Sequence, residues 1–258
     1  MNSPDPLAAM LRSAGCVFAE DEATILRDAA GGDAGLLQRL CVRRIHGEPL
    51  EHVVGWVAFA GRRLSVGPGV FVPRRRSELL AAVTLGAAAQ IREPTVLEDY
   101  CGVAPIAATV AAHLPAAHVH ATDIDEHALV HARRNVGDDR VYRGDGLAGV
   151  PTDLRGAITV LAAVPPYVPA GALALLPHEA AEHEPRRALL AGADGLDEVR
   201  RLIVDAHAWL APGGHLAIEM NTTQADVIAA EAGENHTVAR FADADGQTAV
   251  LRLTCTGG

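Results

Sequence analysis

The sequence predicts an α/β protein in which a small helical bundle and a β-hairpin precede a parallel, doubly wound sheet. Three observations predict this fold: the first 45 residues carry helical periodicity, a short β-prone stretch follows, and helix-like and strand-like segments then alternate. The 258 residues suffice for one large domain with a smaller appendage. We therefore expect a helical bundle over 1–51, a hairpin linker over 52–73 and the main α/β domain over 74–258.

The bundle is predicted from three segments whose apolar residues lie three or four positions apart, at 7–15, 21–32 and 34–45. After residue 51 the pattern changes to the β-prone runs HVVGWVAF, RRLSV and VFV. AGRR and Gly67-Pro68-Gly69 interrupt these runs, as turns do. The runs and turns together predict the hairpin.

In the main domain, helical and β-prone segments alternate along the chain. Helices are expected at 77–91, 105–114, 126–136 and 197–210, and strands at 95–99, 118–123, 140–145, 157–164 and 215–220. This alternation favours parallel strands joined by helices. The last segment, 236–254, predicts two strands around a turn at Asp245-Gly246, which form an antiparallel hairpin at the edge of the sheet.

The composition excludes several classes of enzyme and partner. All 22 basic residues are Arg, and without Lys the chain has no lysine Schiff base, lysine nucleophile or phosphate-loop lysine. The net charge of −10 comes from residues 94–258, where 22 acidic residues face 11 Arg. Because sustained contact with a phosphate backbone needs a basic surface, we expect no direct nucleic-acid partner.

Cysteine spacing and hydropathy indicate the compartment. The four Cys residues are scattered, with no CxxC motif, as is typical of a reduced protein. The amino-terminal residues lack the apolar core of a signal peptide, and no apolar stretch reaches the length of a membrane span. We expect a cytoplasmic protein without a membrane partner.

Acidic residues follow three of the predicted strands. Glu98 and Asp99 end the first strand and precede a loop with Gly102, Asp123 ends the next strand, and Asp145 follows the third. Ligands of open parallel sheets bind at these carboxyl ends, and an acid about 20 residues beyond the loop glycine suits ribose hydroxyls. Asp145 would then meet an adenine amino group. The alternative is that such acids only cap the helices that follow.

Six motifs in order resemble the HemK/PrmC family of protein-glutamine methyltransferases. They are Gly47-Glu48-Pro49-Leu50-Glu51-His52, Pro68-Gly69-Val70-Phe71-Val72-Pro73-Arg74, Val164-Pro165-Pro166-Tyr167, His183-Glu184-Pro185 with Ala188-Leu189, Gly192-Ala193-Asp194-Gly195-Leu196-Asp197 and Pro212-Gly213-Gly214. The resemblance extends from about Leu11 to about Leu253 and is closest to a branch from high-GC bacteria.

The resemblance implies a Rossmann-like, seven-stranded methyltransferase domain that binds S-adenosylmethionine. It also implies a release-factor-like protein as a possible substrate, with another protein or a small molecule as the other acceptors to consider. The cofactor residues it indicates are Asp99, Tyr100, Gly102, Asp123 and Asp145. Nothing in the sequence indicates the oligomeric state.

The cofactor loop departs from the family pattern, which is an acid followed after one residue by GxGxG. Tyr100, Gly102 and Ala104 occupy the three glycine positions here. Glycine lets the backbone approach the cofactor without a β-carbon in the way. The Tyr100 ring either fills the methionyl space or stacks on the sulfonium cation. We favour the first interpretation.

The acceptor loop departs from the family pattern as well. The family has Asn-Pro-Pro-Tyr, whose Asn amide and a neighbouring carbonyl hold the target glutamine amide, and this chain has Val164 in place of the Asn. An isopropyl group makes no hydrogen bonds, so the acceptor site is expected to have diverged. Pro165 and Tyr167 remain candidates to line it. The alternative for these two residues is a purely structural proline turn with a packed Tyr.

Two further features of the sequence could carry chemistry. The segment 73–78 contains three consecutive Arg, which would either make the mouth of the site basic or simply begin a solvated helix. His178 and His183 resemble a zinc-protease HExxH motif with one residue too many, which places them about 140° apart on a helix. We therefore expect no metal site.

These observations lead to two hypotheses about function. The first is an S-adenosylmethionine-dependent N-methyltransferase of the HemK/PrmC type with a diverged acceptor site. The alternative is a pseudoenzyme or repurposed binding protein on the same fold. The loss of two glycines and the Asn favours the alternative, whereas Asp123 and Asp145 favour the enzyme.

Overall fold

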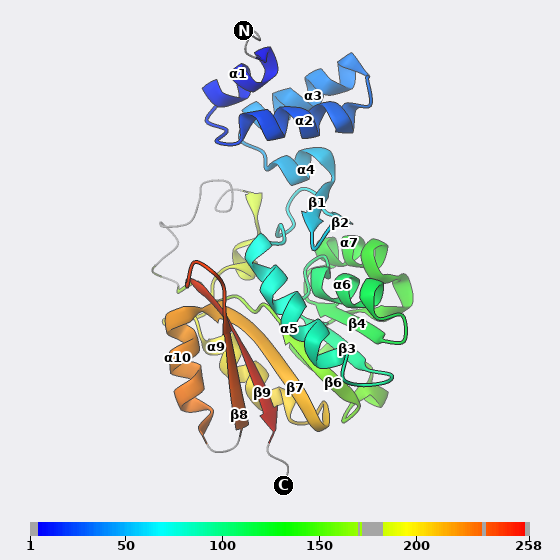
Figure 1. The fold of residues 1–258 in the computed structure, drawn as a ribbon, viewed down its shortest axis with the longest axis vertical. Coiled ribbons are helices and arrows are strands. Elements are labelled where there is room, and N and C mark those ends of the chain that lie inside the picture. Colours follow the sequence, from blue (N-terminus) through cyan, green and yellow to red (C-terminus); the bar gives the residue numbers. More distant parts are fainter. Residues whose placement is uncertain (1–4, 170, 172–182, 234–235, 256–258) are drawn as a thin grey trace.

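The computed structural model describes residues 5–169, 171, 183–233 and 236–255. Its amino-terminal part is helical and lies apart from the sheet (Figure 1). The helices are α1 (Pro6–Ser13), α2 (Ala19–Ala30), α3 (Ala34–Ile45) and the short α4 (Leu50–Val54). Their apolar faces share one buried cluster that includes Leu11 and Leu26. Inside this bundle Arg44 Nε of α3 lies 2.6 Å from the Glu22 carboxylate of α2.

A two-stranded antiparallel hairpin, β1 (Trp56–Phe59) and β2 (Arg62–Ser65), follows the bundle. The predicted strand begins too early, because residues 52–54 end α4, where Val53 packs into the helical cluster and Gly55 with φ +81° ends the helix. A short apolar run suits a buried helical turn as well as a strand. The expected strand at 70–72 is wrong too: these residues form no strand, and Val70 and Val72 pack into the buried cluster that includes α5.

The main sheet has seven strands in the order β5-β4-β3-β6-β7-β9-β8. They are β3 (Thr95–Asp99), β4 (His118–Asp123), β5 (Val141–Arg143), β6 (Ile158–Ala163), β7 (Leu210–Asn221), β8 (His236–Ala242) and β9 (Thr248–Cys255). The first five strands in this order pair in parallel, and β9 is antiparallel to both β7 and β8. The predicted α/β fold, with its antiparallel edge hairpin, is confirmed.

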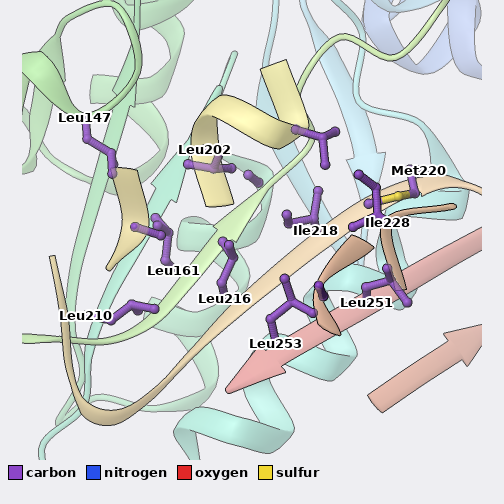
Figure 2. Close-up of a cluster of buried hydrophobic side chains, with 14 of the residues drawn as sticks. Leu147, Leu161, Leu202, Leu210, Leu216, Ile218, Met220, Ile228, Leu251 and Leu253 are labelled. Carbon is purple, nitrogen blue, oxygen red and sulfur yellow. The ribbon is translucent and has the colours of Figure 1, made fainter. Parts of the chain in front are cut away.

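Helices cover both faces of the sheet (Figure 1). One face packs against α5 (Glu78–Ala88), α6 (Pro105–His113) and α7 (Glu126–Val136), and the other against α9 (Asp197–Ala206) and α10 (Thr222–Glu231). Figure 2 shows the second interface, where Leu161, Leu216 and Ile218 of the sheet meet Leu202 of α9. The 3₁₀ turns are η1 (Arg75–Ser77), η2 (Asp138–Arg140), η3 (Gly146–Gly149), η4 (Thr152–Leu154) and η6 (Arg186–Ala188).

The boundaries of the last elements differ from the prediction. The helix expected to reach residue 210 ends at Ala206, and β7 already starts at Leu210, before the Pro-Gly-Gly turn. The helix α10 lies at 222–231, where the periodicity of the sequence predicts none. Its start carries a capping box between Asn221 and Gln224, a signal that would have identified it.

The strand register aligns the carboxyl ends of the central strands. Asp99 pairs with both Thr122 and Ala163, and Ala163 pairs with Ile218. The residues one step further along β3, β4, β6 and β7 therefore lie in one row at the edge where parallel sheets bind ligands. Among the described residues, no helix has both the length and the hydropathy that a membrane span requires.

Candidate functional site

A cavity of about 740 Å³ lies along the carboxyl ends of β3, β4, β6 and β7. Its lining includes seven of the eight candidate residues, namely Tyr100, Gly102, Asp123, Asp145, Val164, Pro165 and Tyr167. Asp99 is not part of the lining: it is 1% exposed beneath the loop, and the neighbouring Glu98 reaches the cavity instead. The topology thus brings together residues that are far apart in the sequence.

In the loop after β3, three residues have a backbone conformation that favours glycine, but only one of the three is a glycine. Tyr100, Gly102 and Ala104 have φ angles of +53°, +52° and +60°, all in the left-handed region. Side chains with a β-carbon rarely adopt this region, at a cost of about 1 to 3 kcal/mol per residue. Since the fold holds Tyr100 and Ala104 in this conformation, the surrounding contacts must stabilise the loop.

The Tyr100 side chain is held by α9. Its hydroxyl donates to Glu198 Oε2 at 2.7 Å and accepts from Arg201 Nη2 at 3.3 Å, while the ring packs against the buried cluster under α9. The same Arg201 nitrogen donates to Asp145 Oδ1 at 2.5 Å. Burial is the main cause that raises the pKa of the Tyr100 phenol. Tyr100 therefore stays neutral and forms a fixed wall of the cavity.

Two buried carboxyls lie at the end of β3. Glu98 Oε2 accepts a hydrogen bond from the Ala107 amide of α6 at 2.7 Å, and Asp99 Oδ1 accepts one from the Tyr100 amide at 2.8 Å. Asp99 Oδ2 has no hydrogen-bond partner within the described residues. Burial raises the pKa of both carboxyls to about 8. Near neutral pH each therefore binds a proton in a large fraction of the molecules.

Replacing Glu98 by Gln should flatten the pH dependence of stability. A carboxyl with a raised pKa contributes stability that is fully present below its unfolded pKa, near 4.5, and is lost as the pH rises through the folded value, about 8. Gln keeps the shape of the protonated acid. Glu98→Gln should therefore be more stable than wild type at pH 8, by about 1 to 3 kcal/mol, and gain little at pH 5.

Urea unfolding at pH 5 to 9 would measure this effect. Glu93→Gln, which removes an exposed carboxyl just before β3, is the matched control. Equal gains at pH 5 and pH 8 in Glu98→Gln would contradict the assignment of a raised pKa to Glu98.

Asp123 ties the loop after β3 to the end of β4. Its Oδ2 accepts from the Gly102 amide and its Oδ1 from the Asp125 amide, both at 2.8 Å. Burial raises its pKa. Asp125, rather than Asp123, caps α7, because its Oδ1 accepts from the His127 amide at 3.0 Å. Helix capping is therefore the role of Asp125. Asp123 lines the cavity, and each of its carboxylate oxygens still has a lone pair available for a ligand.

The loop that follows β6 and begins with Val164 is firmly held. Gln224 Nε2 of α10 donates to the Tyr167 carbonyl at 2.9 Å, and a β-carbon on Gly195 would lie 2.3 Å from that carbonyl oxygen. Gly195 therefore has to be glycine for the loop to pack here. Val164 lies at the start of the loop, lines the cavity and packs against the cluster under α5. At the position where the resemblance implies an Asn, the side chain is therefore the isopropyl group of Val164, in a loop held in place by hydrogen bonding and packing.

Two of the three consecutive Arg at the mouth are paired with acids. Arg74 Nη2 lies 2.6 Å from Glu184 Oε2, and Arg76 Nε lies 3.7 Å from Glu219 Oε1. Arg75 is exposed and begins η1. The segment leads into α5, while Arg74 and Arg76 line the cavity and lie beside buried acids that offset their charges.

No group of three or more metal-ligating side chains occurs among the residues that the structure describes. His178 of the HExxH-like segment lies outside those residues, and His183 lies inside them.

Relatives with known names resemble the chain over most of its length. A release factor glutamine methyltransferase from Streptomyces coelicolor is 39% identical over 186 residues, which cover 70% of this chain and 66% of the relative. One from Gloeobacter violaceus is 36% identical over 216 residues, which cover 79% of this chain and 74% of the relative. The chain belongs to the release factor glutamine methyltransferase (HemK/PrmC) family. It spans about two thirds of the Streptomyces coelicolor member.

The relatives of this HemK/PrmC member also include an enzyme with a different acceptor. The 4-amino-L-phenylalanine/4-methylamino-L-phenylalanine methyltransferase of Streptomyces pristinaespiralis is 36% identical over 193 residues, which cover 70% of this chain and 64% of the relative. Among solved structures, a methyltransferase from Pyrococcus furiosus shares the fold with a TM-score of 0.53 at 19% identity, over 77% of this chain and 91% of that one. No protein-family model matches the chain.

Proposed function

We propose that this protein is a cytoplasmic S-adenosylmethionine-dependent N-methyltransferase whose acceptor is not a glutamine amide. One observation carries the proposal. The same cavity is lined by cofactor candidates, namely the Gly102 loop, Asp123 and Asp145, and by Val164 at the position where the family has an Asn. The amine named as the acceptor of the Streptomyces pristinaespiralis relative supports a change of acceptor within the family. The bundle, the hairpin linker and the catalytic domain are proposed as the units at 1–51, 52–73 and 74–258.

The described residues fit the cofactor. A β-carbon on Gly102 would meet no atom within 4 Å, so its backbone borders open space that a ligand can enter. Asp123 ends β4, and Asp145 lies two residues after the neighbouring strand β5. Asp123 would accept hydrogen bonds from the ribose hydroxyls, and Asp145, whose Oδ1 also accepts from Arg201, would accept one from the adenine amino group. The cavity also lies within the range of roughly 300 to 1,000 Å³ that holds small ligands.

Tyr100→Gly should tighten cofactor binding. Glycine removes the ring from the methionyl side, an effect of about 1 to 3 kcal/mol in binding free energy. It also relieves the left-handed φ of +53°, which should raise the stability of the protein and not its affinity. Calorimetry with S-adenosylhomocysteine would measure it. Tyr100→Phe, which keeps the ring and loses only the hydroxyl that donates to Glu198, is the control. Weaker binding by Tyr100→Gly would instead assign the ring a favourable contact with the sulfonium.

In the proposed reaction the main task of the protein is to align the acceptor nitrogen with the methyl group. The cofactor supplies an electrophilic methyl group when it is bound. Val164, Pro165 and Tyr167 would orient the acceptor nitrogen toward that group, and the fixed loop after β6 would exclude water from it. The second candidate is a binding protein that transfers no methyl group, and the Tyr100 wall anchored on Glu198 favours it.

Calorimetric titration with S-adenosylmethionine and S-adenosylhomocysteine tests the proposal. We expect saturable binding of both, with one molecule per chain. If neither binds at concentrations far above those in a cell, the methyltransferase proposal is wrong and the binding-protein candidate takes its place.

A further inference from the structure

A buried carboxylate, Glu219, lies beside the position where the family has its Asn. Ala163 of β6 pairs with Ile218 of β7, so the next residues, Val164 and Glu219, lie at the same level on adjacent parallel strands. Side chains alternate along strands, and Ala162 and Ala217, two residues earlier, both pack toward α5. Val164 and Glu219 therefore share one face, and both line the cavity.

The Glu219 carboxylate has unused hydrogen-bonding capacity. The residue is 0% exposed. The Ser77 side chain and the Arg76 guanidinium face the carboxylate and act to lower its pKa, but within the described residues neither oxygen accepts a hydrogen bond of normal geometry. The nearest cation, Arg76 Nε, is 3.7 Å away, beyond hydrogen-bonding distance. A buried acceptor without a partner is costly, whereas a ligand N–H that reached it would remove the cost.

The surroundings favour a neutral amine over an amide or an ammonium ion. An amide needs a donor for its carbonyl as well as an acceptor for its N–H groups, and the Val164 side chain supplies neither. An ammonium ion has no lone pair with which to attack a methyl group. It would also bind weakly, because its charge would be buried beside the Arg76 guanidinium, which already offsets part of the Glu219 charge. A neutral arylamine needs only an acceptor for N–H, and its ring suits the apolar walls formed by Phe71, Val72 and Leu189.

We propose that the acceptor is a primary or secondary arylamine whose N–H is bound by Glu219. The inference rests on the proposed methyltransferase function and names the substrate class of the same site. As the amine nitrogen bonds to the methyl carbon, the carbon–sulfur electron pair stays with the sulfur of the donor and the N–H proton passes to the Glu219 carboxylate. Burial also raises the pKa of Glu219, which makes it a better proton acceptor.

Three fragments of similar size separate the possibilities. Aniline is a neutral amine, benzamide carries an amide, and benzylamine is an ammonium ion at pH 7. Their dissociation constants for the full chain would be measured by ligand-observed NMR, with and without saturating S-adenosylhomocysteine. We expect aniline to bind at least about tenfold more tightly than benzamide or benzylamine, the difference that one hydrogen bond to a charged group makes.

The matched variant is Glu219→Gln, which keeps the size of the side chain and loses its charge. The preference for aniline should fall about tenfold in Glu219→Gln and remain in Glu51→Gln, which removes a carboxyl from another part of the cavity lining. Should benzamide or benzylamine bind best, or should the preference for aniline survive in Glu219→Gln, the inference is overturned.

The two proposals fail in different ways. Calorimetry with S-adenosylhomocysteine on the same samples reports on the cofactor alone. An absence of cofactor binding overturns the methyltransferase function even if aniline binds. Normal cofactor binding without a Glu219-dependent preference for aniline overturns only the arylamine inference. Mass spectrometry for N-methylaniline after incubation with S-adenosylmethionine then tests whether the bound amine is methylated.

Discussion

A bacterial release factor that is incubated with this protein and labelled S-adenosylmethionine should keep the glutamine of its Gly-Gly-Gln loop unmethylated. Val164 lines the cavity at the position where the family resemblance implies an Asn, and its isopropyl group forms no hydrogen bond to an amide. Two missing hydrogen bonds and the lost alignment amount to several kcal/mol, or roughly a thousandfold in rate. Peptide mass spectrometry after the incubation would locate any label.

Val164→Asn should restore part of this activity. Val and Asn are similar in size, and the hydrogen bond between Gln224 and the Tyr167 carbonyl should keep the loop in place. An unpaired amide in the free protein would lower its stability by about 1 to 3 kcal/mol. Val164→Ala, which opens the same space without an amide, is the control and should stay inactive on glutamine.

Robust glutamine methylation by the unmodified chain would return the protein to the ordinary activity of its family. The same result would remove the main reason to look for another acceptor.

The sheet could be predicted because its signals are local. The central strands are short apolar runs, and β3 and β4 each end in an acid before a helix. Local patterns are ambiguous at residues 52–54, where an apolar run that suits a strand ends the helix α4. They also fail to predict α10, because this helix is only weakly amphipathic. Tertiary packing decided both cases, since Val53 and Ile228 each complete a buried cluster.

The partners of the site residues could not be predicted, because they come from distant segments. Tyr100 is fixed by Glu198 and Arg201 of α9, almost a hundred residues later. Glu219 occupies a polar position within a strand, which resembles ordinary alternation until the register places it beside Val164. Sequence analysis identified the altered loop positions, and only the fold shows what now surrounds them.

The loop after β3 shows that a backbone conformation typical of glycine can persist when other residues replace the glycines. The family glycines suggest a loop in which the β-carbon is excluded, yet Tyr100 and Ala104 keep φ angles of +53° and +60°. The Gly102 amide is held by Asp123, and the Ala107 amide by Glu98. The first hydrogen bond anchors the middle of the loop and the second the first turn of α6, which follows it, so the loop keeps its shape after two glycines are lost.

Asp123→Ala should weaken the binding of every adenosyl ligand by about 1.5 to 3 kcal/mol, or roughly tenfold to 150-fold in Kd. Its carboxylate accepts one backbone N–H on each oxygen and has lone pairs left for the two ribose hydroxyls. The variant also frees the Gly102 amide, so the loop that borders the cofactor loses its anchor. Calorimetry with S-adenosylhomocysteine would measure the change in affinity.

A lower stability of Asp123→Ala has to be separated from a direct effect on binding. Asp33→Ala removes a carboxylate that caps α3 far from the cavity, and should cost about 1 kcal/mol of stability with no change in ligand affinity. Thermal unfolding and circular dichroism of both variants would establish that each is folded at the temperature of the titration. If folded Asp123→Ala binds S-adenosylhomocysteine as tightly as the wild type, Asp123 does not contact the ribose, and the cofactor must lie elsewhere in the cavity.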